Sequence, residues 1–321
     1  MSEIASLILP LFGLIFIGYI AARITKQPEE ALGWLNTLII YVALPCLFFK
    51  LLSKTPVEEL ASINFIFTNL AATFLIFGVI FLIGTAIRRS AIPEATVQGL
   101  AGAYGNIGYM GPALAILAFG EMAAVPVALI FCFENVMHFV IAPTMMALGG
   151  GEKRRLGPLV LEIAKKIFLH PFIIATGLGI LAAFTELALP RPIEGLMNYL
   201  AQAAAPCALF AMGVSLALRP LKRVPVELFY IVPANLVLHP LLMYVLLSWA
   251  GDFDPVWVYT AVLLAALPTA TNVFVIAQQY GVWIERASAS ILVNTTLSVL
   301  TVSALLYGIK SGLIPPDLFP G

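Results

Sequence analysis

The sequence predicts an all-α integral membrane protein with ten transmembrane helices, arranged as two inverted repeats of five helices. Two observations predict this class. Of the 321 residues 61% are hydrophobic and 11% are charged, and the mean hydropathy of +1.01 lies well outside the range of soluble domains. The chain also repeats itself, without a gap, at an offset of 161 residues. The paired positions are Pro10 and Pro171, Gly18 and Gly179, Ala21-Ala22 and Ala182-Ala183, Pro45-Cys46 and Pro206-Cys207, and Gly120 and Gly281.

Apolar stretches of about 20 residues, the length at which a helix crosses a bilayer, occur five times in each half. They cover residues 4–22, 31–52, 63–87, 96–119, 123–148, 167–186, 193–217, 226–250, 255–279 and 287–309. An odd number of crossings gives the two halves opposite orientations. Such inverted repeats are typical of secondary transporters, whose substrate site lies near the midplane. We expect a first repeat over residues 1–148, a cytoplasmic linker over 149–166 and a second repeat over 167–321.

The basic residues predict the orientation, because Lys and Arg remain mainly on the cytoplasmic side. One set of alternating loops holds thirteen of them and the other set holds four. This distribution places both termini outside an inner (plasma) membrane. The thirteen are Arg23, Lys26, Arg88, Arg89, Lys153, Arg154, Arg155, Lys165, Lys166, Arg219, Lys222, Arg223 and Arg286. The dense cluster at 153–155 is explained as a topology anchor and gives no indication of a nucleic-acid partner.

Two of the ten spans carry signals for a broken helix. In span 96–119, glycine recurs at every third position from Gly99 to Gly111, and Pro112 follows at once. Glycine costs about 1 kcal/mol in a helix interior and proline about 3 kcal/mol, whereas proline is well suited to a first helical position. The pattern predicts an interruption near residues 105–111, with Asn106 and Tyr109 inside it. An alternative remains open, in which the glycines only permit tight helix packing.

The ninth span, 255–279, carries a matching interruption at residues 267–272, which includes Pro268, Thr269, Thr271 and Asn272. Unpaired backbone groups are tolerated at membrane depth only where protein or a water-filled cavity surrounds them. The helix that restarts after each break would also present free N–H groups and a partial positive charge, which suit a carboxylate. The paired breaks therefore predict a substrate site for a small organic anion.

Glu134 stands apart among the acidic residues, because sixteen of the seventeen lie in loops or at span ends. A charged carboxylate at mid-membrane depth is costly, which marks Glu134 as a functional candidate. Asn135 is adjacent, and His138 lies one helical turn further on the same face. Glu134 and His138 could together hold and release a proton, or they could form a purely structural hydrogen bond. By contrast, Asn235 and His239, just before Pro240, are better explained as groups that satisfy a proline kink.

A second polar cluster lies in the tenth span, the repeat partner of the fifth. Asn294 and Thr295 could complete an ion site beside the ninth-span break, or could bond only to their own helix. The sequence contains no metalloprotease, nucleophile-elbow or P-loop motif. Its three cysteines lie within apolar spans and form neither a disulfide framework nor zinc spacing. We therefore expect no enzyme activity, no catalytic residue, no cofactor and no metal site.

Four segments resemble the auxin efflux carrier family of bacterial permeases, which is related to the plant PIN carriers and includes proteins assigned as malonate and other organic-acid transporters. They are residues 35–49, residues 198–213, the stretch Gly-Asn-Ile-Gly-Tyr-Met-Gly-Pro at 105–112, and Pro-Thr-Ala-Thr-Asn-Val-Phe-Val-Ile-Ala at 268–277 with Tyr280-Gly281. The resemblance runs nearly the whole length.

The resemblance implies a fold like that of bile-acid and sodium–proton antiporter relatives, with helices 4 and 9 crossing at their breaks. It also implies a scaffold of helices 1, 2, 6 and 7, through which the chain would form a homodimer among membrane lipids. Helices 3–5 and 8–10 would form a mobile core that moves as an elevator. Asn106 and Asn272 would be the crossover amides near the substrate.

These arguments give two sets of candidate site residues. The expected substrate-binding set is Asn106, Gly108, Tyr109, Gly111, Pro112, Pro268, Thr269, Thr271 and Asn272. The expected ion- or proton-coupling set is Glu134, Asn135, His138, Asn294 and Thr295. The coupling ion would be H⁺ or Na⁺. An uncoupled carrier and a ligand sensor with the same fold remain alternatives at this point.

Overall fold

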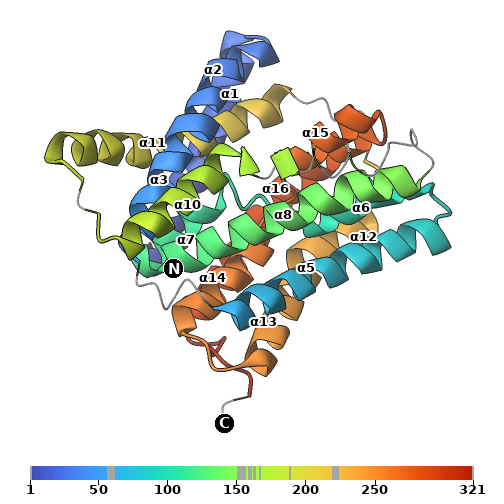
Figure 1. Cartoon of the computed structure of the whole chain (residues 1–321). Helices are drawn as coiled ribbons and strands as arrows, with labels where there is room; N and C mark the ends of the chain where they lie inside the picture. The colour runs from blue at the N-terminus through green and yellow to red at the C-terminus, as the bar shows by residue number, and fades with distance from the viewer. Residues whose placement is uncertain are drawn as a thin grey trace. The chain divides into compact units, whose positions relative to one another are not determined.

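The computed structural model describes residues 2–55, 62–149, 157, 161, 164–165, 168–187, 189–218 and 224–319. Helices make up the architecture of this part of the chain (Figure 1). Most of the expected linker, with its basic cluster at 153–155, lies outside the described residues. Helices fall on all ten expected spans. Among the described residues, six helical segments are long and apolar enough to cross a membrane by length and composition, namely Glu30–Leu52, Ile63–Ile87, Glu121–Leu148, Arg191–Leu218, Leu228–Ala250 and Ile284–Lys310.

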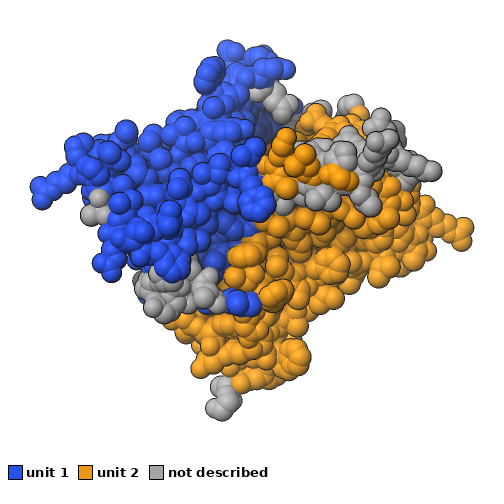
Figure 2. Space-filling model, viewed as in Figure 1, with its two compact units in different colours: residues 1–63, 108–132, 168–219 blue, residues 64–107, 133–167, 220–321 orange. Residues whose placement is uncertain are grey.

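The chain divides into two compact units, coloured separately in Figure 2. Unit 1 comprises Met1–Ile63, Gly108–Cys132 and Phe168–Arg219. Unit 2 comprises Asn64–Ile107, Phe133–Ile167 and Pro220–Gly321. Each unit is therefore assembled from segments of both halves of the sequence.

Unit 1 is built around two pairs of packed helices. In the first pair α1 (Ser2–Thr25) lies along α11 (Arg191–Leu218), and in the second α10 (Pro171–Phe184) lies along α3 (Leu44–Leu52). The remaining elements of this unit are η1 (Glu29–Leu32), α2 (Gly33–Leu38), η2 (Ile39–Ala43), α7 (Gly111–Phe119), η4 (Glu121–Ala123) and the first part of α8 (Ala124–Leu148).

Glycines bring the backbones of these helix pairs into contact. A methyl carbon added at Gly18 on α1 would lie 2.2 Å from the carbonyl oxygen of Phe210 on α11, and one added at Gly213 would lie 1.9 Å from the carbonyl oxygen of Ile15. In the second pair, a methyl carbon at Gly179 on α10 would lie 3.1 Å from the carbonyl oxygen of Phe49 on α3. Close approach through small residues is a general means of packing helices in membranes.

Two of these contacts, that of Gly18 with Phe210 and that of Gly179 with Phe49, are equivalent under the 161-residue offset. Gly18 corresponds to Gly179, and Phe210 corresponds to Phe49, so each half contributes the glycine of one contact and the phenylalanine of the other. This reciprocity supports the inverted-repeat interpretation with an observation that the sequence pattern did not include.

Substitution of Gly213 by Ala is expected to destabilise unit 1. The added methyl group meets backbone atoms of α1, which cannot rotate away, so the loss should be about 1–3 kcal/mol. The matched control is Gly195→Ala on the same helix, where no atom of the described residues beyond its own turn of helix lies within 4 Å of the added carbon. Alanine is the better helix former by about 1 kcal/mol, so that variant should be neutral or more stable. Size-exclusion chromatography of detergent-solubilised protein after stepwise heating measures both effects; equal stability of the two variants would contradict the close packing.

Unit 2 holds the helices that surround the candidate site. They are α5 (Ile63–Leu82), η3 (Ile83–Ile87), α6 (Ile92–Ala103), the larger part of α8, α12 (Leu228–Pro233), η5 (Ala234–Leu238), α13 (His239–Ala250), α14 (Pro255–Ala265), α15 (Thr271–Tyr280) and α16 (Ile284–Lys310). The wide π-helical turn η5 precedes Pro240, which has no N–H group to continue a regular helix.

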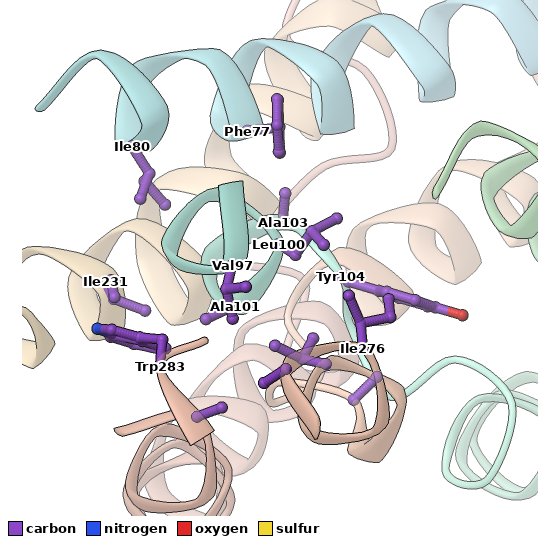
Figure 3. Packing of buried hydrophobic residues seen from close by; sticks show 14 of the residues in the cluster. Phe77, Ile80, Val97, Leu100, Ala101, Ala103, Tyr104, Ile231, Ile276 and Trp283 are labelled. Atoms are coloured by element: carbon purple, nitrogen blue, oxygen red, sulfur yellow. The ribbon is translucent and has the colours of Figure 1, made fainter. Parts of the chain in front are cut away.

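A hydrophobic cluster forms the core of unit 2 (Figure 3). Its largest fully buried side chain belongs to Tyr104, which directly follows α6. Its other labelled members lie on α5, α6, α12 and α15 and directly before α16, and they include Phe77, Ile80, Val97, Leu100, Ile231, Ile276 and Trp283. In Figure 3 the ring of Tyr104 lies in this cluster while its hydroxyl group points away from it.

The glycines of the expected span 96–119 serve more than one purpose. A methyl carbon at Gly99 would lie 2.8 Å from the ring of Phe77, and one at Gly102 would lie 1.9 Å from Cδ1 of Ile80. Both glycines therefore allow α5 to pack closely on α6, as the packing interpretation of the sequence proposed. Gly105 differs, because it lies beyond the end of α6 in the expected helix break.

Candidate functional site

Both predicted helix breaks are present. Helix α6 ends at Ala103 and the next helix, α7, begins at Gly111, which confirms the interruption expected at 105–111. Helix α14 ends at Ala265 and α15 begins at Thr271. The second break is displaced slightly from the expected range of 267–272, because Ala270 is extended and the helix resumes directly after it.

The two breaks pair with each other inside unit 2. Gly105 and Thr269 form an isolated antiparallel bridge. On either side of it, the N–H group of Asn106 donates to the carbonyl of Pro268 at 2.7 Å, and the N–H group of Ala270 donates to the carbonyl of Tyr104 at 2.8 Å. Backbone groups released by the breaks are thereby satisfied away from water, as the membrane interior requires.

Gly105 permits the close approach of the two chain segments. A methyl carbon at this position would lie 3.2 Å from the carbonyl oxygen of Leu264 and 3.5 Å from that of Leu267. Thr269 fixes the bridge from the other side, because its hydroxyl donates to the carbonyl of Ala101 at 2.5 Å and accepts from Nδ2 of Asn294 at 3.0 Å. Thr269 is fully buried, so it shapes the break from within the protein.

Tyr104 connects the ninth-span break to α8. Its hydroxyl accepts a hydrogen bond from Nδ2 of Asn272 at 2.8 Å and donates one to Oδ1 of Asn135. Asn272 is exposed and lies in the first turn of α15, whereas Asn135 is buried and adjoins Glu134 in the sequence. A chain of three polar side chains thus leads from an accessible helix start to the buried carboxylate region.

The expected substrate-binding residues are divided between the two units. Asn106, Pro268, Thr269, Thr271 and Asn272 belong to unit 2, where the paired breaks bring them together. The others, Gly108, Tyr109, Gly111 and Pro112, belong to unit 1. Within unit 2 the two crossover amides differ, because the side chain of Asn106 is buried and that of Asn272 is exposed.

Glu134 is buried, with an exposed fraction of 3%, and is held by a partner that the sequence did not reveal. The hydroxyl of Thr73 on α5 lies 2.7 Å from Oε1 of Glu134 and 3.1 Å from Nε2 of His239, the first residue of α13. His239 therefore faces the carboxylate cluster. The proline-kink interpretation of His239 is wrong in this respect, because the ring meets a neighbouring helix.

The proline-kink interpretation of Asn235 is also wrong. Its Nδ2 donates to the carbonyl of Gly102 at 3.2 Å, so the side chain joins η5 to the last turn of α6. The contact supports the end of α6 immediately before the break, rather than the local turn of its own helix.

His138 occupies the helical face shared with Glu134, as expected, but no side-chain hydrogen bond joins the two. Its ring instead stacks on the ring of Tyr104, with centroids 3.9 Å apart and planes inclined by 2°. The ring is fully buried. The alternative of a structural hydrogen bond between the two side chains is therefore not observed, and His138 acts as the surface against which Tyr104 is held.

A second group of polar atoms lies on α16. Asn294 is anchored to Thr269 through Nδ2, while its Oδ1 has no hydrogen-bond partner in the described part of the chain. The hydroxyl oxygens of Ser290 and Thr295 are likewise buried and unpartnered among these residues. Buried oxygen atoms of this kind are the ligands that hard cations select.

Thr73, Tyr104 and His239 are the site residues that sequence reasoning missed. Tyr104 carried a usable signal, because it directly precedes the glycine of a predicted break. Thr73 carried none, since single threonines in membrane helices more often bond their own backbone.

A paired helix break surrounded by buried polar side chains, in a chain with several apolar spans, defines an integral membrane protein of the transport class. The family described as membrane transport protein matches residues 4–306. The chain belongs to this family, which confirms the resemblance to the auxin efflux carriers and shows a transporter rather than an enzyme.

Proteins similar to this chain come from bacteria and archaea. A protein of Rhizobium meliloti (strain 1021) with the name "Putative malonate transporter" is 64% identical over 320 residues, which cover 100% of both chains. An uncharacterised transporter of Methanothermobacter thermautotrophicus is 25% identical and covers 92% of this chain and 95% of its own. The uncharacterised transporter YfdV of Escherichia coli (strain K12) is 24% identical over 94% of this chain and 96% of its own.

The exposure of Asn272 can be tested by labelling. In a protein whose three native cysteines are replaced, Asn272→Cys should react with a small aqueous thiol reagent. The control is Asn294→Cys, whose side chain is fully buried and should remain unreactive. An Asn272→Cys variant as unreactive as Asn294→Cys would contradict the exposure of this side chain.

Proposed function

We propose that this protein is a secondary active transporter of a small organic anion, with a malonate-like dicarboxylate as the favoured substrate, and that Glu134 couples transport to protons. The observation that carries the proposal is the buried carboxylate of Glu134 in the same unit as the paired breaks, one residue from Asn135. The name of the 64% identical relative supports the substrate class.

Helix starts and amides would recognise the anion. The first turn of α15 presents N–H groups that have no partner within their own helix, and the helix dipole adds partial positive charge there. Asn272 is exposed at the start of α15. The sequence places no Lys or Arg in the middle of a span, so the charge of a bound carboxylate would not be neutralised by a basic side chain.

Protonation of Glu134 would complete the charge balance. An ionised Glu134 near an anionic substrate would repel it and would also carry its own desolvation cost. A proton on Glu134 removes both penalties, so the loaded carrier could cross the membrane with less net charge. The chain from Asn272 through Tyr104 to Asn135 is the route by which an occupied site would be sensed near Glu134.

Accumulation in proteoliposomes tests the proposal. Radiolabelled malonate, with acetate and succinate as size controls, is supplied outside vesicles that carry an inward proton gradient, an inward sodium gradient or neither. Uptake against the malonate gradient under the proton gradient alone is the expected result. Absence of accumulation under every condition would instead favour an uncoupled carrier or a ligand sensor.

Sodium coupling is the second candidate, and a specific observation favours it. The unpartnered oxygens of Ser290, Asn294 and Thr295 on α16 are of the type that binds a hard cation. Accumulation driven by the sodium gradient alone, and lost in Asn294→Leu, would support this candidate over proton coupling.

An elevator mechanism is the proposed form of alternating access. Unit 1 contains expected spans 1, 2, 6 and 7, which are the proposed scaffold and dimerisation helices, and unit 2 contains spans 3, 8, 9 and 10. Spans 4 and 5, which were expected in the mobile core, are divided, because their residues 108–132 belong to unit 1 and their remaining residues to unit 2. This division supports a mobile unit 2 that carries the candidate site. Fluorophores on α11 and α14 should show substrate-dependent changes in distance in single-molecule measurements, and a constant distance would contradict the mechanism.

Both termini are proposed to lie outside the cell membrane, from the thirteen-to-four distribution of basic residues. Reporter fusions after Gly321 and after Arg154 should give opposite compartment signals. The same signal from both fusions would contradict the count of ten spans.

A further inference from the structure

We propose that His239 is the residue through which protons reach Glu134, and that the hydroxyl group of Thr73 relays them. This inference deepens the proposed proton coupling and rests on it. It identifies a proton donor on α13 for the carboxylate on α8, and the hydroxyl that connects them lies on α5.

The contact between α5 and α13 fixes the position of Thr73. Along this antiparallel pair, Nδ2 of Asn64 donates to the carbonyl of Ala250 at 2.6 Å, and Nδ2 of Asn69 contacts Sδ of Met243 at 3.4 Å. Thr73 follows Asn69 by one helical turn, as His239 precedes Met243 by one turn. The register of the two helices therefore places the Thr73 hydroxyl against the His239 ring.

The geometry of Thr73 links two titratable groups through one oxygen atom. Oγ1 of Thr73 lies 2.7 Å from Oε1 of Glu134 and 3.1 Å from Nε2 of His239. All three side chains are buried, with exposed fractions of 0–3%. The Thr73 hydroxyl is therefore the direct connection between the carboxylate and the ring.

The number of available donor protons sets the direction of the hydrogen bonds from His239 through Thr73 to Glu134. A threonine hydroxyl has one proton to donate and can accept at its lone pairs. When Thr73 donates to the Glu134 carboxylate, its contact with His239 is a hydrogen bond only if Nε2 of His239 carries the proton and donates. The other ring nitrogen, Nδ1, is then the acceptor, and it has no hydrogen-bond partner in the described part of the chain.

The proton transfer balances in three linked steps. A proton binds at Nδ1 of His239, and the ring becomes an imidazolium. The proton on Nε2 then moves to Oγ1 of Thr73, while the original hydroxyl proton of Thr73 moves to Oε1 of Glu134. The products are a protonated Glu134, a regenerated Thr73 hydroxyl and a neutral His239 with its proton on Nδ1. Rotation of the hydroxyl and exchange of the ring proton restore the starting arrangement.

The surrounding groups are compatible with this relay. On α8, His138 and Asn135 adjoin Glu134, and His138 is an electrostatic neighbour of His239. Tyr104 faces the cluster from the end of α6 and is occupied by its bonds to Asn135 and Asn272. In the described part of the chain, neither Lys nor Arg forms a hydrogen bond or ion pair with the three relay residues, so the charge of the imidazolium is offset by the Glu134 carboxylate.

Three substitutions test the relay. Thr73→Val keeps the shape of the side chain and removes the hydroxyl, whereas Thr73→Ser restores a hydroxyl in the same position. His239→Gln keeps an N–H donor toward Thr73 but cannot bind and release a proton. The measurements are malonate accumulation under a proton gradient, malonate exchange at equal pH on both sides, and the alkalinisation of the external medium on addition of malonate, recorded with a pH dye.

Thr73→Val and His239→Gln should lower the rate of proton-driven accumulation and of alkalinisation by about tenfold or more, as loss of a proton-transfer group does. Exchange at equal pH should change little, and Thr73→Ser should recover coupled uptake. A purely structural role for Thr73 would lower exchange and accumulation together.

Coupled uptake at the native rate in both Thr73→Val and His239→Gln would overturn the relay, even with proton coupling intact. If the native protein itself ignored the pH gradient, the proposed function would fail instead. The two failures are therefore distinguished by the native protein in the same assay.

Discussion

Glu134→Gln is expected to abolish malonate accumulation driven by a pH gradient while leaving exchange of internal for external malonate. Glutamine has the shape of a protonated glutamate and can still receive the hydrogen bond from Thr73, but it cannot release a proton. The loaded carrier can then cross in both directions, but without coupling to the gradient. Uptake and exchange in the same proteoliposomes measure the two activities.

The pH dependence should have a defined sign. In the proposed mechanism the protonated form of Glu134 accompanies the substrate, so raising the external pH should lower uptake by the native protein. Residual exchange by Glu134→Gln should not depend on pH in this way. The matched control is Glu121→Gln, an exposed position at the start of η4, which should behave as the native protein does. Normal accumulation by Glu134→Gln would make Glu134 a structural residue.

Tyr104→Phe should weaken substrate binding and its dependence on pH at the same time. The substitution keeps the ring that stacks on His138 but removes the hydroxyl that joins Asn272 to Asn135. Loss of a hydrogen bond from a buried group costs about 1–3 kcal/mol, so the half-saturating malonate concentration should rise by roughly tenfold.

Tyr307→Phe is the control for this substitution, because Tyr307 is exposed on α16 of the same unit. The half-saturating concentration is measured at two external pH values for each variant. An unchanged value and an unchanged pH dependence in Tyr104→Phe would separate the helix break from the carboxylate cluster and remove Tyr104 from the proposed mechanism.

The helix breaks could be predicted from the sequence because their causes are local. Glycine and proline act on the backbone at their own positions, so the run from Gly99 to Pro112 and the Pro268 segment indicated where each helix ends. The same argument located Glu134, since the cost of a mid-membrane carboxylate depends on depth, and depth follows from the boundaries of the span.

The partners of Glu134 could not be predicted, because they depend on which helices pack together and in what register. Thr73 is 61 residues from Glu134 and His239 is 166 residues from Thr73 along the chain. Spacing within one helix instead suggested His138, which does share the face of Glu134. The ring of His138 stacks on the flat ring of Tyr104, so His138 packs against that side chain instead of bonding to the Glu134 carboxylate.

The reciprocal glycine contacts of unit 1 have an evolutionary consequence. In a symmetric homodimer, a glycine of one subunit that meets a phenylalanine of the other is always accompanied by the same contact with the subunits exchanged. Gly18 against Phe210 and Gly179 against Phe49 are such a pair, now within one polypeptide. Two copies of a half-length ancestor, each with one glycine and one phenylalanine, would have made both contacts before gene fusion, and a covalently separated pair of halves should still recognise each other through them.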